Sequence, residues 1–192
     1  MGFKIVKLHG CSGAGKTTVA RSVLTSANVV HRIVPEGAKR PEAYACEFVG
    51  ADAPIIVLGS YENNCGGMDS VPKAETAMKL VKEYHELGHV LHEGLLQSTY
   101  YGAMGIDSQQ YGDDYIYAFL DTPIMTCLER VTHRRDVQQS KNKFNPQLTV
   151  DKYNTIASLK EKLIKKGDHR VVTFRYNDDP LGQLKTLFFS GS

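Results

Sequence analysis

Short apolar runs and stretches with helical spacing of apolar residues alternate along the chain. The first run, residues 3–8, is typical of a buried strand, and residues 18–24 continue as the opening turns of a helix. Apolar spacing over residues 73–87 predicts a further helix that ends at Gly88. The other expected strands are residues 29–34, 44–49, 54–59, 89–92, 115–120 and 170–174, and the other expected helices are residues 123–135, 149–166 and 180–189.

This alternation predicts an α/β fold. Residues 50–53 are typical of a hairpin turn, which places a small antiparallel element beside a mainly parallel sheet. Strands that alternate with helices favour a three-layer, doubly wound arrangement of the P-loop NTPase type, with the site at the carboxyl ends of the strands. The length of 192 residues predicts one domain spanning residues 1–192.

The segment of residues 10–17 has the pattern Gly-x-x-x-x-Gly-Lys-Thr between an expected strand and an expected helix. Its glycines let backbone N–H groups and the positive end of the helix surround a polyphosphate. Lys16 is expected to reach the β and γ phosphates, and the Thr17 hydroxyl is expected to bind Mg²⁺. An ordinary glycine-rich turn is the alternative. The residues expected to bind ATP are Gly10, Cys11, Ser12, Gly13, Ala14, Gly15, Lys16, Thr17 and Thr18.

Residues 59–70 form a polar loop with several glycines directly after an apolar strand. Because strand ends direct loops toward the ligand, Asp69 or Glu62 is a candidate to accept a proton from an attacking hydroxyl. Tyr61 in this loop is a candidate surface for stacking on the acceptor. The alternative is a solvated turn in which Asp69 caps the following helix.

Glu93 directly follows the expected strand 89–92, where phosphate-loop enzymes commonly keep an acid near Mg²⁺. The alternative is a structural carboxylate that pairs with a nearby base. Residues 97–101 continue this segment, and Tyr100 is a second candidate for contact with the acceptor. Aromatic residues at this spacing are equally typical of core packing.

Arg130 and Arg134 are four residues apart on an expected helix and therefore share one face. Two guanidinium groups there are suited to neutralise a phosphoryl group during transfer, with residues 130–147 as an arginine-bearing lid. The alternative is that these cations only interact favourably with the helix dipole at its carboxyl end.

Positive charge is concentrated late in the chain. Residues 130–170 hold eleven Lys and Arg against four Asp and Glu, a net +7, whereas the whole chain carries +2 and the remainder therefore −5. Such a segment is suited to bind phosphates of a nucleotide or a nucleic acid, although a solvated helix face over residues 158–166 explains part of it. No apolar run reaches the ~20 residues of a membrane span, so we expect a cytoplasmic protein without a membrane partner. Its four scattered cysteines are expected to be free thiols.

Residues 10–17, 58–69 and 88–96 together resemble a group of bacteriophage P-loop kinases. Some members phosphorylate the hydroxymethyl group of 5-hydroxymethyluracil within DNA. The resemblance implies in-line phosphoryl transfer with ATP and Mg²⁺, and DNA with a modified pyrimidine as substrate. It implies catalytic roles for Lys16, Asp69, Glu93, Arg130 and Arg134.

The acceptor is not fixed by these motifs. Other kinases of similar appearance act on free nucleosides or nucleotides, and this is the first alternative. A nucleotide-binding module without catalytic activity is the second. The sequence leaves open the preference for ATP over GTP and the oligomeric state.

Overall fold

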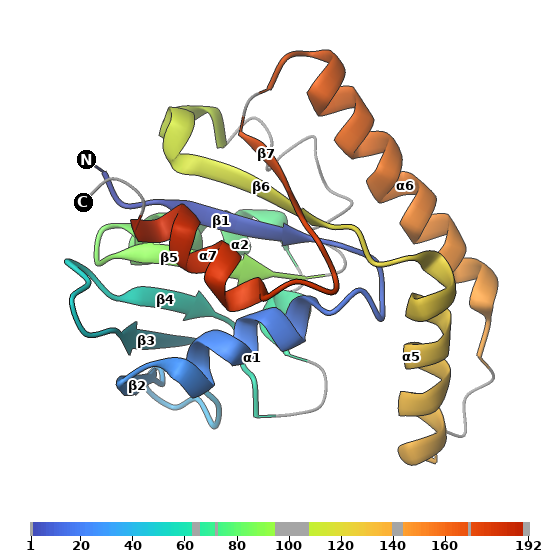
Figure 1. Ribbon diagram of the computed structural model, residues 1–192. Helices are drawn as coiled ribbons and strands as arrows, with labels where there is room; N and C mark the ends of the chain where they lie inside the picture. Colours follow the sequence, from blue (N-terminus) through green and yellow to red (C-terminus); the bar gives the residue numbers. More distant parts are fainter. Residues whose placement is uncertain are drawn as a thin grey trace.

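The computed structural model describes residues 2–62, 66–71, 73–94, 108–139, 144–168 and 170–189. Its strands are β1 (Ile5–His9), β2 (Val29–Ile33), β3 (Ala43–Glu47), β4 (Ile55–Leu58), β5 (His89–Glu93), β6 (Tyr115–Leu120) and β7 (Val171–Phe174). They form one seven-stranded sheet in the order β2-β3-β4-β5-β1-β6-β7 (Figure 1). Neighbouring strands from β4 to β7 are parallel, whereas β2 with β3 and β3 with β4 are antiparallel, which confirms the predicted mixed sheet.

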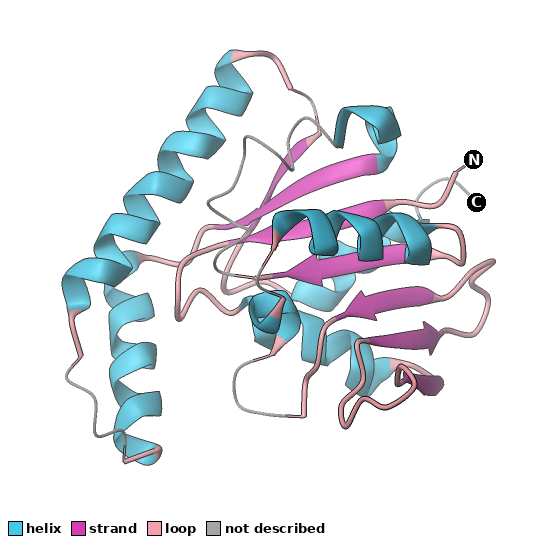
Figure 2. Ribbon diagram, turned by 180° about the vertical axis from the view of Figure 1, so that it is seen from behind, coloured by secondary structure: helices cyan, strands magenta, loops and turns pink. Residues whose placement is uncertain are grey.

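Helices cover both faces of this sheet, so the predicted three-layer fold is confirmed. The α-helices are α1 (Lys16–Ser26), α2 (Ala74–His85), α5 (Ile124–Val137), α6 (Pro146–Lys165) and α7 (Pro180–Phe189). Two 3₁₀ segments, η1 (Gly67–Ser70) and η2 (Ser108–Asp114), lie in the connections. Helices α1 and α7 lie on the face seen in Figure 1, and α2 is on the face seen from behind in Figure 2.

The sheet side chains alternate between two hydrophobic cores, as the two-residue period of a strand requires. In β6, Tyr115, Tyr117 and Phe119 join the core under α2 and α6. The intervening Ile116 and Ala118 join the core under α1 and α7. Because both faces are covered, β4 and β6 are apolar along their whole length, which is the signal that the sequence analysis used.

Strand β1 lies where the strand order reverses. It is paired with β5 on one side and with β6 on the other, and Leu8 of β1 is aligned with Glu93 and Ala118. The loop after β1 therefore begins beside the carboxyl end of β5, and open α/β sheets bind ligands at this switch point.

The observed ends of the elements agree with the sequence-based ranges within a few residues. The largest shift is at α6, which begins at Pro146 rather than near Thr149. The Asn145 side chain accepts a hydrogen bond of 3.0 Å from the backbone N–H of Gln147, and Pro146 occupies the first turn. Both are strong helix-start signals that the apolar spacing alone does not contain. None of the helices in the described ranges is long and apolar enough to cross a membrane.

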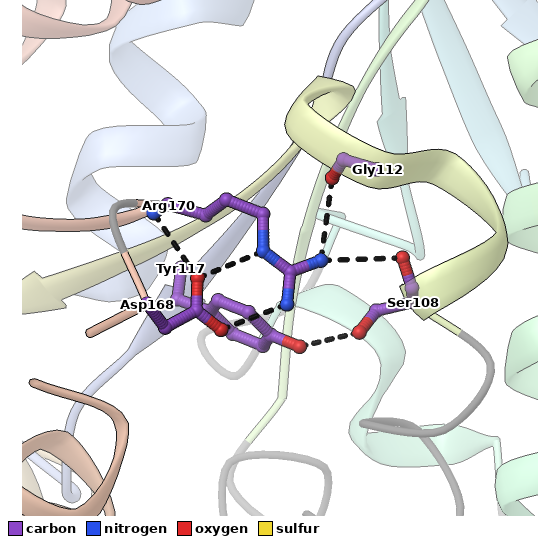
Figure 3. Close-up of polar contacts among 5 residues, drawn as sticks. All are labelled: Ser108, Gly112, Tyr117, Asp168 and Arg170. Atoms are coloured by element: carbon purple, nitrogen blue, oxygen red, sulfur yellow. Dashed lines mark hydrogen bonds and ion pairs between the residues drawn. The ribbon is translucent and has the colours of Figure 1, made fainter. Parts of the chain in front are cut away.

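At the opposite end of the sheet, Arg170 connects the beginnings of β6 and β7 (Figure 3). Its Nε and Nη2 donate to the two carboxylate oxygens of Asp168, both at 2.8 Å, and Nη1 donates to the carbonyl oxygens of Ser108 and Gly112 at 3.5 and 3.2 Å. The guanidinium also lies over the Tyr117 ring, 5.3 Å from its centroid. Because both charged side chains are only 13% exposed, this pair supports the fold and does not add to the accessible charge of the basic segment.

Candidate active site

The loop after β1 and the start of α1 form the floor of a cavity of about 670 Å³. Its size is within the usual range for small-molecule sites. Gly15, with φ 101°, directly precedes α1 in the left-handed region, and the helix begins at Lys16. The Lys16 ammonium donates to the carbonyl oxygens of Gly10 (2.8 Å) and Cys11 (3.2 Å), which holds it within the loop. The predicted phosphate-binding residues that line the cavity are Cys11, Ser12, Gly13, Ala14, Gly15, Lys16, Thr17 and Thr18.

The loop is fixed to the segment between β6 and α5. The Thr122 hydroxyl donates to the Ala14 carbonyl oxygen at 2.7 Å. Gly13 has φ +82°, and a Cβ atom there would be 2.3 Å from the carbonyl oxygen of Cys127. Only glycine permits this approach, so the loop and α5 are packed backbone to backbone.

Thr17 and Glu93 meet on one side of the cavity. The Thr17 hydroxyl donates to Oε1 of Glu93 at 2.8 Å, and Glu93 is 2% exposed. Burial raises the pKa of the Glu93 carboxyl, and the Lys16 ammonium and the Thr17 hydrogen bond act in the opposite direction. The two predicted metal ligands are therefore adjacent, at the end of β5.

Asp69 lies in η1 and lines the same cavity, with its side chain exposed. Gly67, two residues before Asp69, has φ +82°, and a Cβ there would be 2.7 Å from the Glu93 carboxyl group. This close contact places the η1 backbone directly against Glu93. Asp69 is not the cap of α2, because the N-cap residue of that helix is Lys73.

Arg130 and Arg134 line the cavity from α5, on the shared face that their spacing predicts. Nη1 of Arg130 donates to the Gly13 carbonyl oxygen at 3.3 Å. One cavity thus contains the phosphate loop, both carboxylates Asp69 and Glu93, and the two arginines.

Two of the predicted acceptor residues, Tyr61 and Glu62, are not among the described residues that line this cavity. Tyr61 is 7% exposed, and its ring packs against the edge of Tyr44 with centroids 6.0 Å apart. This burial leaves no open ring face for stacking, and together with the charges of Glu93 and Asp69 it raises the pKa of Tyr61. Glu62 forms an exposed ion pair with Arg32 of β2. Tyr100 lies outside the described residues.

Other lining residues were missed by the sequence analysis. Arg21 of α1 faces the cavity one helical turn after Thr17. Val19 of the same helix also lines it, and others come from the ends of β6 and β7 and the following segment, namely Leu120, Phe174, Arg175, Tyr176 and Pro180. Their position at the carboxyl ends of two predicted strands was the available signal.

The remaining predictions concern metals and thiols. In the described ranges, no three His, Cys, Asp or Glu side chains are grouped to hold a metal ion by themselves. Cys11, Cys46 and Cys127 are buried free thiols, and Cys65 lies outside these ranges.

Comparison with known proteins identifies relatives over most of the chain. The profile of a family described as "5-hmdU DNA kinase" matches residues 3–169. A 5-hmdU DNA kinase of Pseudomonas phage M6 is 31% identical over 177 residues, which cover 86% of this chain and 88% of the relative. Another, of Pseudomonas phage PaMx11, is 31% identical over 162 residues, which cover 82% and 84% of the two chains.

Among solved structures, a gluconokinase from Sinorhizobium meliloti aligns with 98% of this chain and 91% of its own chain. The TM-score is 0.50 and the identity 12%, so this similarity concerns the fold alone. Both the sequence matches and the fold are those of P-loop kinases, and the chain belongs to the 5-hmdU DNA kinase family.

Proposed function

We propose that this protein transfers the γ-phosphoryl group of ATP to the hydroxymethyl group of 5-hydroxymethyluracil in DNA. The observation that carries the proposal is the single cavity in which a phosphate loop, a buried Thr17–Glu93 pair, an exposed carboxylate and two arginines converge. The relatives that cover most of the chain bear this activity in their names, which supports the choice of acceptor.

The nucleotide is assigned to the phosphate loop. Backbone N–H groups of residues 10–18 and the amino end of α1 surround the phosphates, and Lys16 is already held beside them by the Gly10 and Cys11 carbonyl oxygens. Mg²⁺ fits the oxygen donors of Thr17 and Glu93, because this ion is commonly bound by one or two protein oxygens together with substrate phosphates. When bound, Mg²⁺ would supply positive charge at the phosphate oxygens.

Asp69 is assigned as the general base. Asp69 is exposed and lines the cavity, whereas Glu62 is not among the described lining residues and Glu93 is buried beside Thr17 at the assigned Mg²⁺ site. In the proposed step the substrate hydroxyl oxygen forms a bond to the γ phosphorus while the bond to the β-γ bridging oxygen breaks. The hydroxyl proton passes to the Asp69 carboxylate, and ADP leaves.

Arg130 and Arg134 are assigned to the charge that develops on the transferring group. They face the loop from α5, and Arg130 contacts it directly. We infer that residues 130–147 act as a lid on a single kinase domain of residues 1–192. We infer a host cytoplasmic location, which the phage origin of the named relatives supports.

A base in DNA must leave the duplex, or be single-stranded, to bring its hydroxymethyl group into this cavity. The cations of α5 and α6 are suited to hold the DNA phosphates, whereas Arg170, which precedes β7 in the same basic segment, is bound to Asp168. Such binding should weaken steeply with added salt, whereas activity on a free nucleoside should depend little on salt.

The decisive experiment incubates the protein with γ-labelled ATP and a panel of acceptors. The panel contains thymidine, thymidylate, 5-hydroxymethyldeoxyuridine, its monophosphate, and DNA that carries this base. We expect label only in the modified DNA, and label on a free monomer would overturn the DNA assignment. Hydrolysis of ATP without transfer to any acceptor would instead favour another alcohol or a binding module.

Two variants test the assigned chemistry. Lys16→Ala should lower the transfer rate by about 10³-fold because it removes a cation from the transferring group. Asp69→Asn keeps the shape of the side chain but removes the base, so we expect a loss of about 10²- to 10⁴-fold. Transfer by Asp69→Asn at the wild-type rate would exclude Asp69 as the base.

A further inference from the structure

Arg21 lies on the same side of the cavity as Asp69. It follows Thr17 by one helical turn, so the two side chains share the face of α1 that is directed toward Glu93 and η1. Helical side chains lean toward the amino end of their helix, which brings Arg21 back toward the phosphate loop. Arg21 lines the cavity together with Gly66 and Asp69.

A main-chain contact fixes the direction of this guanidinium group. Nη2 of Arg21 donates to the Tyr61 carbonyl oxygen at 3.3 Å, in the loop that leads from β4 to η1. A guanidinium carries five N–H donors in a planar fork, and this bond directs the group toward the loop between β4 and η1. Burial raises the pKa values of Glu93 and Tyr61, and the positive charge of Arg21 acts in the opposite direction on both, so this charge reaches the site.

The other cations on the described walls of the cavity are placed differently. Lys16 is within the phosphate loop, and Arg130, Arg134 and Arg175 come from α5 and from the segment after β7. Lys16, Arg130 and Arg134 are the three assigned to ATP and its transferring phosphate. Arg21 is beside the carboxylate assigned to the acceptor.

The assigned chemistry at the acceptor does not itself require this cation. The hydroxymethyl group is neutral, and Asp69 suffices to take its proton. A nucleotide within DNA, however, always has a phosphodiester on each side of its sugar. An arginine fork is well suited to bind two oxygens of such a group.

We propose that Arg21 binds a phosphodiester of the DNA strand next to the target nucleotide, and thereby selects DNA over the free nucleoside. This inference rests on the proposed function, since it assumes that the acceptor enters beside Asp69. It assigns a second phosphate site to the cavity, one helical turn from the first. The contact is to DNA and leaves the ATP site unchanged.

The test combines a protein change with a matched DNA change. Arg21→Ala removes the guanidinium, and a methylphosphonate linkage on the 5′ or the 3′ side of a single 5-hydroxymethyldeoxyuridine removes one phosphate charge. Each change alone should raise the KM for the oligonucleotide by about tenfold, the usual effect of losing a charged hydrogen bond. At the contacted linkage the two changes together should raise this KM no more than either change alone, because both remove the same interaction.

Further readouts separate this contact from a purely structural role. For Arg21→Ala the KM for ATP should stay at the wild-type value, and the slope of log affinity for DNA against log salt should decrease by about 1. Arg21→Lys should recover part of the affinity, because it restores the charge without the fork. Arg32→Ala is the matched control, because it also removes one arginine near the same loop, from a side chain that is bound to Glu62.

Binding measurements keep this inference distinct from the proposed function. Fluorescence anisotropy with the same oligonucleotides and a non-hydrolysable ATP analogue reports the coupling whether or not transfer occurs. If wild-type protein fails to label the modified DNA, the proposed acceptor is wrong, and the coupling in binding still decides the role of Arg21. The inference is overturned if, at both linkages, the fold losses of DNA affinity caused by Arg21→Ala and by the methylphosphonate multiply in the combination. It is also overturned if Arg21→Ala lowers kcat equally for charged and neutral DNA and leaves the KM values unchanged.

Discussion

The two ends of the central sheet use arginine in different ways. At the carboxyl ends of the strands, Arg130 is exposed and borders the cavity together with Arg134. At the amino ends, Arg170 is 13% exposed and is bound by Asp168 and by the carbonyl oxygens of Ser108 and Gly112 (Figure 3). At the amino ends a carboxylate and two carbonyl oxygens of the chain bind the guanidinium, whereas at the cavity end Arg130 makes one hydrogen bond of 3.3 Å, to Gly13, and borders the cavity.

This contrast assigns stability and activity to opposite ends of the sheet. A buried guanidinium whose partners are all within the chain contributes to folding, and removing it leaves charged partners behind. Exposed cations beside a phosphate loop contribute little to folding and remain available to an anion. Substitutions at the two ends should therefore separate the two properties.

The largest expected effect concerns the cavity end. The double variant Arg130→Ala/Arg134→Ala should lower the transfer rate by about 10³-fold, because both charges assigned to the transferring group are lost. Its free energy of unfolding should change by less than about 1 kcal/mol, since surface substitutions are usually mild. Initial rates and denaturant unfolding measure the two quantities, and strong destabilisation would contradict the contrast.

The second effect concerns the opposite end. Arg170→Ala should lower the free energy of unfolding by about 3 kcal/mol, because it leaves the Asp168 carboxylate without its main partner. The transfer rate per folded molecule should stay within about twofold of wild type, and Asp168→Ala provides the reciprocal variant. A loss of rate in protein that remains folded would show that this end also serves the reaction.

A third prediction concerns the middle of the sheet. Burial lowers the pKa of Lys7, on β1, to about 7. Between that pH and the unfolded value of 10.5 the unfolded chain binds a proton that the folded chain does not, so stability rises with pH across this window. Lys7→Met should remove this contribution, which raises the free energy of unfolding by about 2 kcal/mol between pH 7 and 9. Urea unfolding at several pH values measures it, and equal slopes for both proteins would contradict the prediction.

The smallest effect concerns the contact that joins the phosphate loop to the segment before α5. Thr122→Val removes the hydrogen bond to the Ala14 carbonyl oxygen and should cost about 1 kcal/mol of stability. The KM for ATP should rise a few-fold, because the loop is less firmly held. Wild-type values for both quantities would show that the packing of Gly13 on Cys127 alone positions the loop.

Much of this arrangement was accessible from the sequence. The strand pattern predicted the layers, and the glycine pattern predicted the loop that leads to Lys16. The i, i+4 spacing of Arg130 and Arg134 predicted their shared face, and Glu93 was located by its position at the end of a strand. Each of these inferences depends on local geometry, which short segments of sequence contain.

The remainder depends on contacts between distant segments. Tyr61 was expected at the acceptor, but packing against Tyr44 of β3 buries its ring. Arg170 was counted with the accessible charge, although Asp168 and two carbonyl oxygens enclose it. Arg21 was not predicted as a site residue, because only the folded loop after β4 brings the Tyr61 carbonyl oxygen to its guanidinium group. In each case the partner is set by tertiary structure.

The antiparallel hairpin formed by β2 and β3 determines which strand forms one edge of the sheet. Without the hairpin, β4 would be the edge strand, directly beside β5, which carries Glu93. With the hairpin, the edge strand is β2. Two added strands correspond to about 10 Å of width. The unpaired backbone N–H and C=O groups of an edge strand can pair with a strand of another copy. The hairpin therefore moves this site of unwanted association away from the opening of the active-site cavity.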